Sequence, residues 1–465
     1  MKKFDLNIEK ILENWEIYHA IREILANAID EQTITHTKPI EVYKDGDNWI
    51  IRDYGRGLKY TALTQNENLE KLENPHVIGK FGIGLKDALA TFDRNKIEIE
   101  IYSKYNRITT ELSPKADFSD IFTLHAIIDE DVDSNFEGTK VCINGIFDED
   151  MKKAKSLFLV FSSNRILSTT KFGEVIDRNG DIGFIYLNGV KVAEEENFLF
   201  SYNITNVTSQ IKKAINRERT NVGRTAYSDT VKKILQKSNS EEVALALAED
   251  LEAIGTGEEK EELKWLDVQI HAIKILNATG KYVFLSQREV FGNNSIMDDI
   301  ISTGKIPKII PENLRMKIIG QRDIDGNEIL DINQFISNYN DSFSFDFIDV
   351  DKLTDSERQI FGYTDKIIEL FGGLPKKVKE IKISKTMRKD YFSDQETLGC
   401  WDEQSASIVI SRKQLKKLEN YSGTLIHEMI HAKTCFDDVT RDFESKLTEF
   451  IGIVSSQLIS GAQKN

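Results

Sequence analysis

Apolar residues recur at intervals of three and four along residues 8–31, which is the spacing of one face of an α-helix. The apolar face consists of Ile8, Ile11, Leu12, Trp15, Ile21, Ile24 and Leu25. Residues 48–53 have the composition of a β-strand. Residues 184–192 surround Asn188-Gly189, a dipeptide typical of a tight β-hairpin. These patterns predict that helices and strands are mixed along the chain.

The mixture continues toward the C-terminus. From about residue 146 to residue 240 helix and strand patterns alternate, and residues 241–277 are helical except around residues 255–257. Residues 405–411 have the character of a further strand. We therefore predict an α+β protein with four parts. Their predicted boundaries are 1–145, 146–240, 241–339 and 340–465.

Length and composition agree with a folded, soluble protein. The 465 residues are enough for two to four domains, and no run approaches the roughly 20 apolar residues of a membrane helix. The N-terminus lacks the apolar segment of a secretory signal. Cys142, Cys400 and Cys435 are scattered and odd in number, which favours reduced thiols. We expect a cytoplasmic location without a membrane segment.

The charge of the chain bears on its partners. The formal net charge is -15, and no block of lysine and arginine stands out. An acidic surface repels phosphate backbones, so nonspecific binding of nucleic acid is disfavoured.

Polar residues share one face of the predicted N-terminal helix. Glu23 and Asn27 are four residues apart, and Asp30 follows about one turn later. A carboxylate and an amide on one helical face can orient water and hold a hard cation through oxygen. Alone this pattern is weak, because most such faces are merely solvated.

The predicted strand 48–53 ends in a glycine-containing turn. Gly55 and Gly57 permit a tight turn and the close approach of a ligand to the backbone. Asp53, at the end of the strand, can accept a hydrogen bond from an exocyclic amine.

A second glycine run precedes an apparent helix at residues 87–90. Gly79, Gly82 and Gly84 lead toward it, and Lys86 lies beside its start. Glycine-rich backbone that enters a helix N-terminus is a ready anion site, although the Walker pattern is absent here.

In their order and spacing these motifs resemble the ATP-binding domain shared by gyrase B, MutL, the ninety-kilodalton heat-shock chaperones, histidine kinases and MORC proteins, the GHKL family. The matching residues are Glu23, Asn27 and Asp30 in the N box, Asp53, Gly55 and Gly57 in the first glycine box, Gly79, Gly82 and Gly84 in the second, and Thr139 in a later Gly-Thr pair. The resemblance implies a Bergerat-type α/β sandwich for residues 1–145 that binds ATP and Mg²⁺.

The resemblance also assigns roles. Glu23 would activate the water that attacks the γ-phosphate, and Asn27 would ligate Mg²⁺. Asp53 would recognise the adenine amine, with Thr139 supporting that end of the pocket. Residues 59–78 would form a lid over ATP. The glycines, Asp30 and Lys86 complete the candidate cofactor-binding set.

In GHKL relatives a second α/β domain reaches back to the γ-phosphate. Residues 146–240 would correspond to this transducer-like domain, and Arg217 is the candidate phosphate sensor. A solvated charged turn is an equally good interpretation of Arg217. Several relatives dimerise when they bind ATP, which implies an ATP-dependent homodimer here. Residues 241–339 would form a connector.

The C-terminal quarter contains a histidine pair of different chemistry. His427 and His431 are four residues apart, so on a helix both imidazoles project from one face. Two neutral imidazoles at this spacing can bind one Zn²⁺, and Glu428 is placed to take a proton from water at the metal. A pair of core histidines is the weaker alternative.

This segment resembles the thermolysin-like gluzincins, which implies a zincin domain over residues 340–465. In that family a glutamate on a second helix supplies the third zinc ligand, and Glu444 fits best, with Glu449 as the alternative. An edge strand lies beside the metal helix and pairs with substrate, a position we expect for residues 405–411.

Together the two resemblances predict an ATP-regulated zinc metallopeptidase that cleaves a protein or peptide. Its expected cofactors are ATP, Mg²⁺ and Zn²⁺. The alternative is a conformational ATPase, similar to chaperones or MORC proteins, whose zinc domain binds a partner or is structural. An intact Glu428 favours catalysis, because a structural site needs no base.

Overall fold

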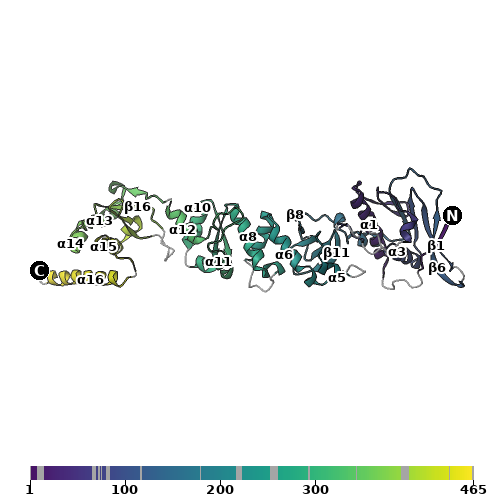
Figure 1. Ribbon diagram of the computed structural model, residues 1–465. Coiled ribbons are helices and arrows are strands. Elements are labelled where there is room, and N and C mark those ends of the chain that lie inside the picture. The colour runs from purple at the N-terminus through teal and green to yellow at the C-terminus, as the bar shows by residue number, and fades with distance from the viewer. Residues whose placement is uncertain are drawn as a thin grey trace. The chain divides into compact units, whose positions relative to one another are not determined.

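The computed structural model is a mixed α+β fold with several sheets, in agreement with the predicted class (Figure 1). The chain divides into two compact units, Met1–Leu276 and Asn277–Asn465. The structure describes residues 2–7, 15–64, 70–71, 74, 76–79, 84–115, 118–178, 180–215, 222–251, 260–291, 294–341, 343–388, 397–438 and 440–462.

A seven-stranded sheet lies at the N-terminal end of the first unit. Its strands are β1 (Lys2–Asp5), β2 (Glu41–Asp45), β3 (Asn48–Arg52), β4 (Glu98–Ser103), β5 (Arg107–Lys115), β6 (Phe118–Asp129) and β7 (Thr139–Asn144). They lie in the order β1-β6-β5-β4-β7-β3-β2, and every neighbouring pair is antiparallel. Alternate residues of β4 and β7 are buried, as expected for a sheet with one covered face.

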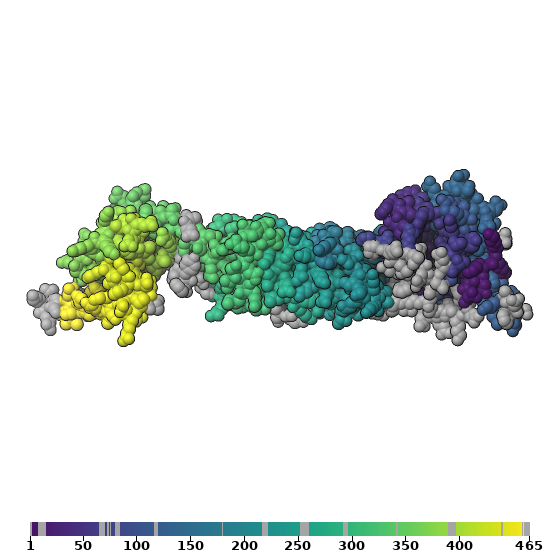
Figure 2. All heavy atoms as spheres, viewed as in Figure 1, coloured from purple at the N-terminus to yellow at the C-terminus, as the bar shows by residue number. Residues whose placement is uncertain are grey.

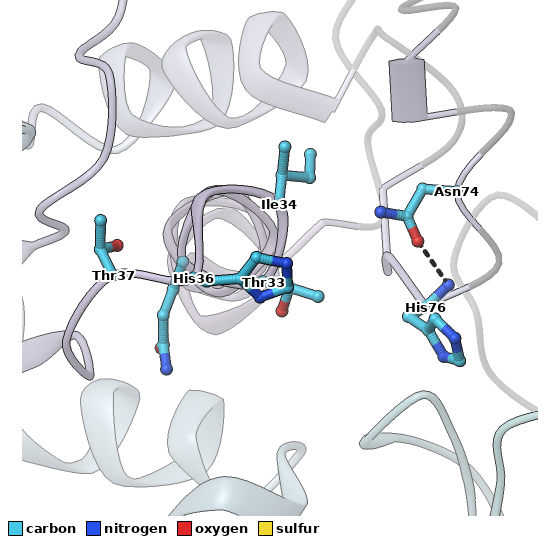
Figure 3. Close-up of a pocket in the computed structure, with 7 residues that line it drawn as sticks. Thr33, Ile34, His36, Thr37, Asn74 and His76 are labelled. Atoms are coloured by element: carbon cyan, nitrogen blue, oxygen red, sulfur yellow. Dashed lines mark hydrogen bonds between the residues drawn. The ribbon is translucent and has the colours of Figure 1, made fainter.

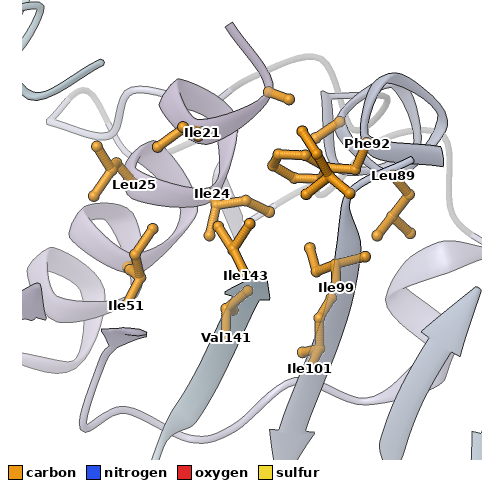
Figure 4. Close-up of a cluster of buried hydrophobic side chains, with 14 of the residues drawn as sticks. Ile21, Ile24, Leu25, Ile51, Leu89, Phe92, Ile99, Ile101, Val141 and Ile143 are labelled. Atoms are coloured by element: carbon orange, nitrogen blue, oxygen red, sulfur yellow. The ribbon is translucent and has the colours of Figure 1, made fainter. Parts of the chain in front are cut away.

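Helices cover that face of the sheet. They are α1 (Ile17–Thr35), α3 (Gly84–Arg94) and α4 (Asp148–Lys155). The core between the layers is built from aliphatic and aromatic side chains (Figure 4). Its labelled members are Ile21, Ile24, Leu25, Ile51, Leu89, Phe92, Ile99, Ile101, Val141 and Ile143. This packing orients the polar face of α1 toward the loops that follow β3 and precede α3.

The helix predicted over residues 8–31 is not continuous. Trp15 and Glu16 are not helical, and α1 begins at Ile17, directly after Glu16 with its extended backbone angles (φ −82°, ψ 166°). The Glu16 N–H donates to His19 Nδ1 at 3.1 Å, which closes the helix end. Residues 8–14 lie outside the described residues.

A second sheet completes the first unit. Its strands are β8 (Ile166–Thr170), β9 (Gly173–Ile176), β10 (Gly183–Leu187), β11 (Val190–Glu195) and β12 (Ser201–Ile204), in the order β11-β10-β12-β9-β8. Its helices are α5 (Ser209–Ala214), α6 (Ser228–Lys237), α7 (Glu241–Leu251) and α8 (Leu266–Ala278), the last of which runs into the second unit. The predicted hairpin is confirmed, since Asn188 and Gly189 both have positive φ (47° and 83°) between β10 and β11.

The second unit contains two smaller sheets. A parallel pair joins β13 (Tyr282–Ser286) and β14 (Ile306–Ile310), with helices α9 (Gln287–Phe291), α10 (Asn294–Ser302), α11 (Glu312–Ile318) and α12 (Ile332–Asp341). The other sheet has the order β15-β16-β18-β17, built from β15 (Phe347–Ile348), β16 (Glu380–Ser384), β17 (Gly399–Asp402) and β18 (Ser407–Ser411). Its helices are α13 (Asp355–Phe361), α14 (Thr364–Phe371), α15 (Leu418–Thr434) and α16 (Arg441–Ala462).

The strand predicted at residues 405–411 is present as β18, but its predicted edge position is wrong. β18 lies inside the sheet between β16 and β17, and all five of its residues are buried. β17 is an edge strand, as is β15, and β17 contacts α15.

Each of the four predicted parts contains its own sheet, whereas the contacts divide the chain into two units.

The last helix, α16, carries exposed isoleucines at positions 451, 453 and 459 and is coloured yellow in Figure 2. Among the described helices, none has both the length and the apolar character needed to cross a membrane.

Candidate functional site

A buried aspartate ties the polar face of α1 to the second glycine run. Asp30 is fully buried, and its two carboxylate oxygens accept hydrogen bonds from the backbone N–H groups of Ile78 (2.6 Å) and Gly79 (2.8 Å). Lys71 Nζ donates to Asp30 Oδ2 at 2.9 Å and to Asn27 Oδ1 at 3.0 Å. A Cβ on Gly79 would lie 2.8 Å from Asp30 Oδ2, so glycine permits this close approach.

Glu23 also lies on α1, and its side chain lies against the start of α3. Its buried carboxylate pairs with the buried guanidinium of Arg22 at 2.9 Å. A Cβ on Gly84, the first residue of α3, would overlap the Glu23 carboxylate. The structure therefore brings the first predicted motif, Glu23, Asn27 and Asp30, together with the described glycines of the second.

Asp53 forms a second polar group at the end of β3. Its buried Oδ1 accepts from the N–H of Gly55 (2.9 Å) and the N–H of Thr139 (3.2 Å). Burial raises the pKa of the Asp53 carboxyl above its ordinary value. Gly138 has a φ of +75° and abuts the Asp53 backbone, and Gly57 has a φ of +85° beside Gly138. The predicted residues of the first glycine box and of the Gly-Thr pair thus meet.

Arg56, close to Asp53 in the chain, connects the Asp53 group with α1 and with the residue before Lys71. Arg56 Nε and Nη2 donate to the two carboxylate oxygens of Glu31, on α1, at 2.9 and 3.0 Å. Arg56 Nη1 donates to both oxygens of Glu70 at 3.0 Å. Burial alone would raise the pKa of Glu31, but the hydrogen bonds from Arg56 outweigh it and hold the pKa below the ordinary value.

Not every predicted nucleotide residue can be placed. Lys86 is half-buried in the first turn of α3. Gly82 and Arg217 lie outside the described residues, as does part of the predicted lid at residues 59–78. Lys71, which contacts Asn27 and Asp30, carries no role in the sequence prediction.

A separate cavity of about 580 Å³ lies near the C-terminal end of α1 (Figure 3). The backbone N–H of His76 donates there to Asn74 Oδ1 at 2.9 Å. The lining residues are Gln32, Thr33, Ile34, His36, Thr37, Asn74 and His76. Asn74 and His76 lie within the predicted lid at residues 59–78, and none of the seven belongs to the candidate cofactor-binding set.

In the second unit, α15 brings two histidines together with an aspartate. His427 Nε2 lies 3.0 Å from Asp438 Oδ1, His431 Nε2 lies 3.1 Å from the same oxygen, and the two Nε2 atoms lie 3.1 Å apart. A tetrahedral zinc with bonds of about 2.0–2.1 Å places its ligand atoms about 3.3 Å apart. The three atoms therefore fit the ligand set of one metal ion.

The surroundings of the two histidines favour forms of the rings that can bind a metal ion. His431 Nδ1 lies 2.7 Å from the carbonyl oxygen of Phe436. A carbonyl only accepts, so Nδ1 carries a proton, and a neutral His431 would then present the lone pair of Nε2 to the cluster. Burial lowers the pKa of His427, which favours its neutral form.

Glu428 lies beside the edge strand β17. Burial raises its pKa to about 7, and a backbone hydrogen bond from Trp401 opposes that rise. A Cβ on Gly399 would lie 3.0 Å from Glu428 Oε1, so glycine makes room for the carboxylate. The predicted proton acceptor is thus a buried carboxylate between α15 and β17.

The predicted third ligand, Glu444, lies outside this cluster. α16 presents Phe443 to the histidines, with its ring centroid 4.5 Å from that of His431 and 4.7 Å from that of His427. Neighbouring residues on a helix point about 100° apart, so Glu444 is turned away and is exposed. Glu449 is also exposed and pairs with Lys446 at 2.7 Å. The clustered carboxylate is Asp438, seven residues after His431.

One domain family and two mycoplasma proteins are similar to this chain. Residues 149–241 match the domain family described as Mycoplasma pneumoniae MPN635 N-terminal domain, a stretch that includes the whole five-stranded sheet. The chain is 38% identical over 244 residues to an uncharacterized protein of Mycoplasma pneumoniae (strain ATCC 29342 / M129 / Subtype 1), covering 51% of this chain and 98% of that protein. The chain therefore belongs to the family of this mycoplasma protein.

A second uncharacterized protein of the same strain is 25% identical over 339 residues. This similarity covers 67% of the present chain and 93% of the relative. Neither name states an activity, so a proposal about function must rest on the two sites.

Proposed function

We propose that this protein is an ATP-regulated zinc metallopeptidase that cleaves a protein or peptide. The observation that carries the proposal is the triangle of His427, His431 and Asp438, with Glu428 on the same helix. Residues 340–465 would then form a small zincin-like domain, with β17 instead of β18 as its edge strand.

The residues of the second unit suit the chemistry of peptide hydrolysis. Bound Zn²⁺ would polarise a carbonyl group and lower the pKa of a bound water, so that this water becomes a nucleophile near neutral pH. His427, His431 and Asp438 would hold the ion, which leaves one tetrahedral position for water or substrate. Glu428 would take the proton from the attacking water and pass it to the leaving amine.

The first unit supports the nucleotide half of the proposal. A GHKL-type domain needs a carboxylate, an amide, an adenine-binding aspartate and flexible glycines around one helix, and these lie around α1 and the end of β3. The oxygens of Asn27 and Asp30 already hold a cation, the ammonium of Lys71, and therefore suit Mg²⁺. ATP would bind there, with Glu23 as the base for hydrolysis.

Regulation would follow from one chain holding both sites. Residues 146–240 would act as the transducer-like part and residues 241–339 as the connector. ATP binding would favour a homodimer in the cytoplasm, as in GHKL relatives, and change the peptidase rate.

One observation favours the alternative of a conformational ATPase with a structural or partner-binding zinc domain. The Phe443 ring stacks on His431 at an interplanar angle of 21° and is itself buried. An aromatic ring over the ligands suits a closed site better than an open catalytic one.

Replacing the clustered aspartate tests the metal centre. Purified protein should contain about one equivalent of zinc, and Asp438→Asn should lower zinc affinity at least about 100-fold, since even outer partners of zinc ligands contribute about 10–100-fold. The measurement is metal analysis with a competing chelator. Glu444→Gln is the matched control and should retain zinc. If Glu444→Gln loses zinc and Asp438→Asn keeps it, the original ligand prediction is right.

Replacing the buried aspartate of the first unit tests the nucleotide pocket. Asp53→Asn should weaken ADP binding about 10–100-fold, because a hydrogen bond to a charged group contributes about 1.5–3 kcal/mol. The amide keeps the size of the side chain, so the fold should persist. Calorimetry with ADP measures the change, and Asp45→Asn, on the exposed end of β2, is the control. Undiminished affinity in Asp53→Asn would remove Asp53 from the adenine site.

A further inference from the structure

The ammonium of Lys71 lies at the centre of the polar face of α1. It is 3.0 Å from Asn27 Oδ1 and 2.9 Å from Asp30 Oδ2, and the Lys71 side chain is only 16% exposed. Asp30 itself is fully buried, so this ion pair is shielded from solvent far more than a surface pair. The lysine therefore occupies an oxygen-lined cation position inside the fold.

The residue before Lys71 is fixed to the other side of the site. Glu70 accepts two hydrogen bonds of 3.0 Å from Arg56, which in turn pairs with Glu31 of α1. Two neighbouring residues of opposite charge thus join residues 70–71 to both polar groups of the first unit. With residues 70–71 held in this way, the charged end of Lys71 lies beside Asn27.

The proposed function gives Asn27 a different cation to bind. If Asn27 Oδ1 ligates Mg²⁺ with the nucleotide phosphates, two cations share one oxygen position. Mg²⁺ binds oxygen at about 2.0–2.1 Å, and an ammonium 3.0 Å from the same oxygen would lie against it. Like charges at such a separation repel strongly where solvent is partly excluded.

We propose that Lys71 is a built-in competitor of Mg²⁺. In the nucleotide-free chain its ammonium neutralises Asp30 and occupies the cation position beside Asn27, and Mg²⁺ with its nucleotide binds only when the ammonium leaves that position. This inference rests on the proposed nucleotide site. It raises the Mg²⁺ concentration that nucleotide binding needs above the value that the oxygen ligands alone would require.

The test is the Mg²⁺ dependence of ADP binding, measured by calorimetry from chelated Mg²⁺ to saturation. Lys71→Met keeps the length of the side chain and removes its charge. The Mg²⁺ concentration that gives half of the full gain in ADP affinity should fall at least about fivefold, the lower end of typical coupling between two binding events. Lys71→Arg keeps a cation and should stay near the wild type.

Lys44→Met is the matched control, because it removes one lysine charge from the same unit at an exposed position on β2. An equal shift in Lys44→Met would indicate a general charge effect and overturn the inference. Loss of ADP affinity in Lys71→Met by the same factor with and without Mg²⁺ would identify a phosphate contact and overturn it too. A wild-type protein that binds neither ADP nor ATP would instead refute the nucleotide site itself.

Discussion

Glu428→Gln is expected to abolish peptide cleavage while the protein keeps its zinc. The amide has the size of the carboxylate but cannot accept the proton of the attacking water. A positioned general base contributes about 10²–10⁴-fold to a rate, so cleavage should fall by at least that range. The proposed zinc ligands His427, His431 and Asp438 remain in place, which separates loss of the base from loss of the metal.

The measurement is release of peptides from a proteome-derived library, followed by metal analysis of the same sample. Glu419→Gln, in the first turn of α15 and exposed, is the control for a lost glutamate on this helix. A Glu428→Gln protein that cleaves at the wild-type rate would exclude Glu428 as the base. Full zinc without cleavage in the wild type would favour the conformational ATPase.

The features that the sequence predicted correctly depend on neighbouring residues. The β10–β11 hairpin is specified by Asn188 and Gly189, which adopt positive φ more easily than most residues. The four-residue spacing of His427 and His431 similarly needs only a helix to bring the two rings together, and α15 supplies it. For the hairpin and for the histidine pair, the local geometry of a few residues was sufficient for the prediction.

The third member of the candidate metal cluster, Asp438, could not be predicted, because its position depends on how two helices meet. α16 begins at Arg441, so Asp438 precedes it and can turn back toward His431. Phe443, not Glu444, then packs on the imidazoles, because the apolar ring gains more from burial than a carboxylate would. The spacing of residues within one helix does not predict how α16 packs against α15.

Lys71 was missed for a similar reason. It lies in a stretch rich in asparagine and glutamate that was predicted as a lid, and its partner Asp30 is 41 residues away. Sequence patterns identify oxygen-bearing side chains on α1 but not the cation that reaches them from elsewhere. The non-helical residues directly before α1 were also missed, because an apolar pattern does not show where Glu16 takes extended backbone angles.

Glu23→Gln is expected to keep ATP binding and to lose hydrolysis by about 10²–10⁴-fold, since it removes a general base and little volume. The buried guanidinium of Arg22 loses its charged partner, and a broken buried pair costs about 3–5 kcal/mol. A thermal unfolding curve must therefore accompany the assay. Glu41→Gln, exposed on β2, is the control. A stable Glu23→Gln protein that hydrolyses ATP normally would exclude Glu23 as the base.

The same variant tests whether the two sites communicate. A protein that holds ATP without hydrolysing it should remain in its nucleotide-bound state, so its peptide cleavage rate should differ from that of the wild type with ADP. Asp53→Asn, which should bind nucleotide poorly, should instead stay at the nucleotide-free rate in every condition. The rates are measured with one substrate in the presence of ATP, ADP or no nucleotide. Equal rates in all three states would leave a nucleotide site and a metal site that act independently on one chain.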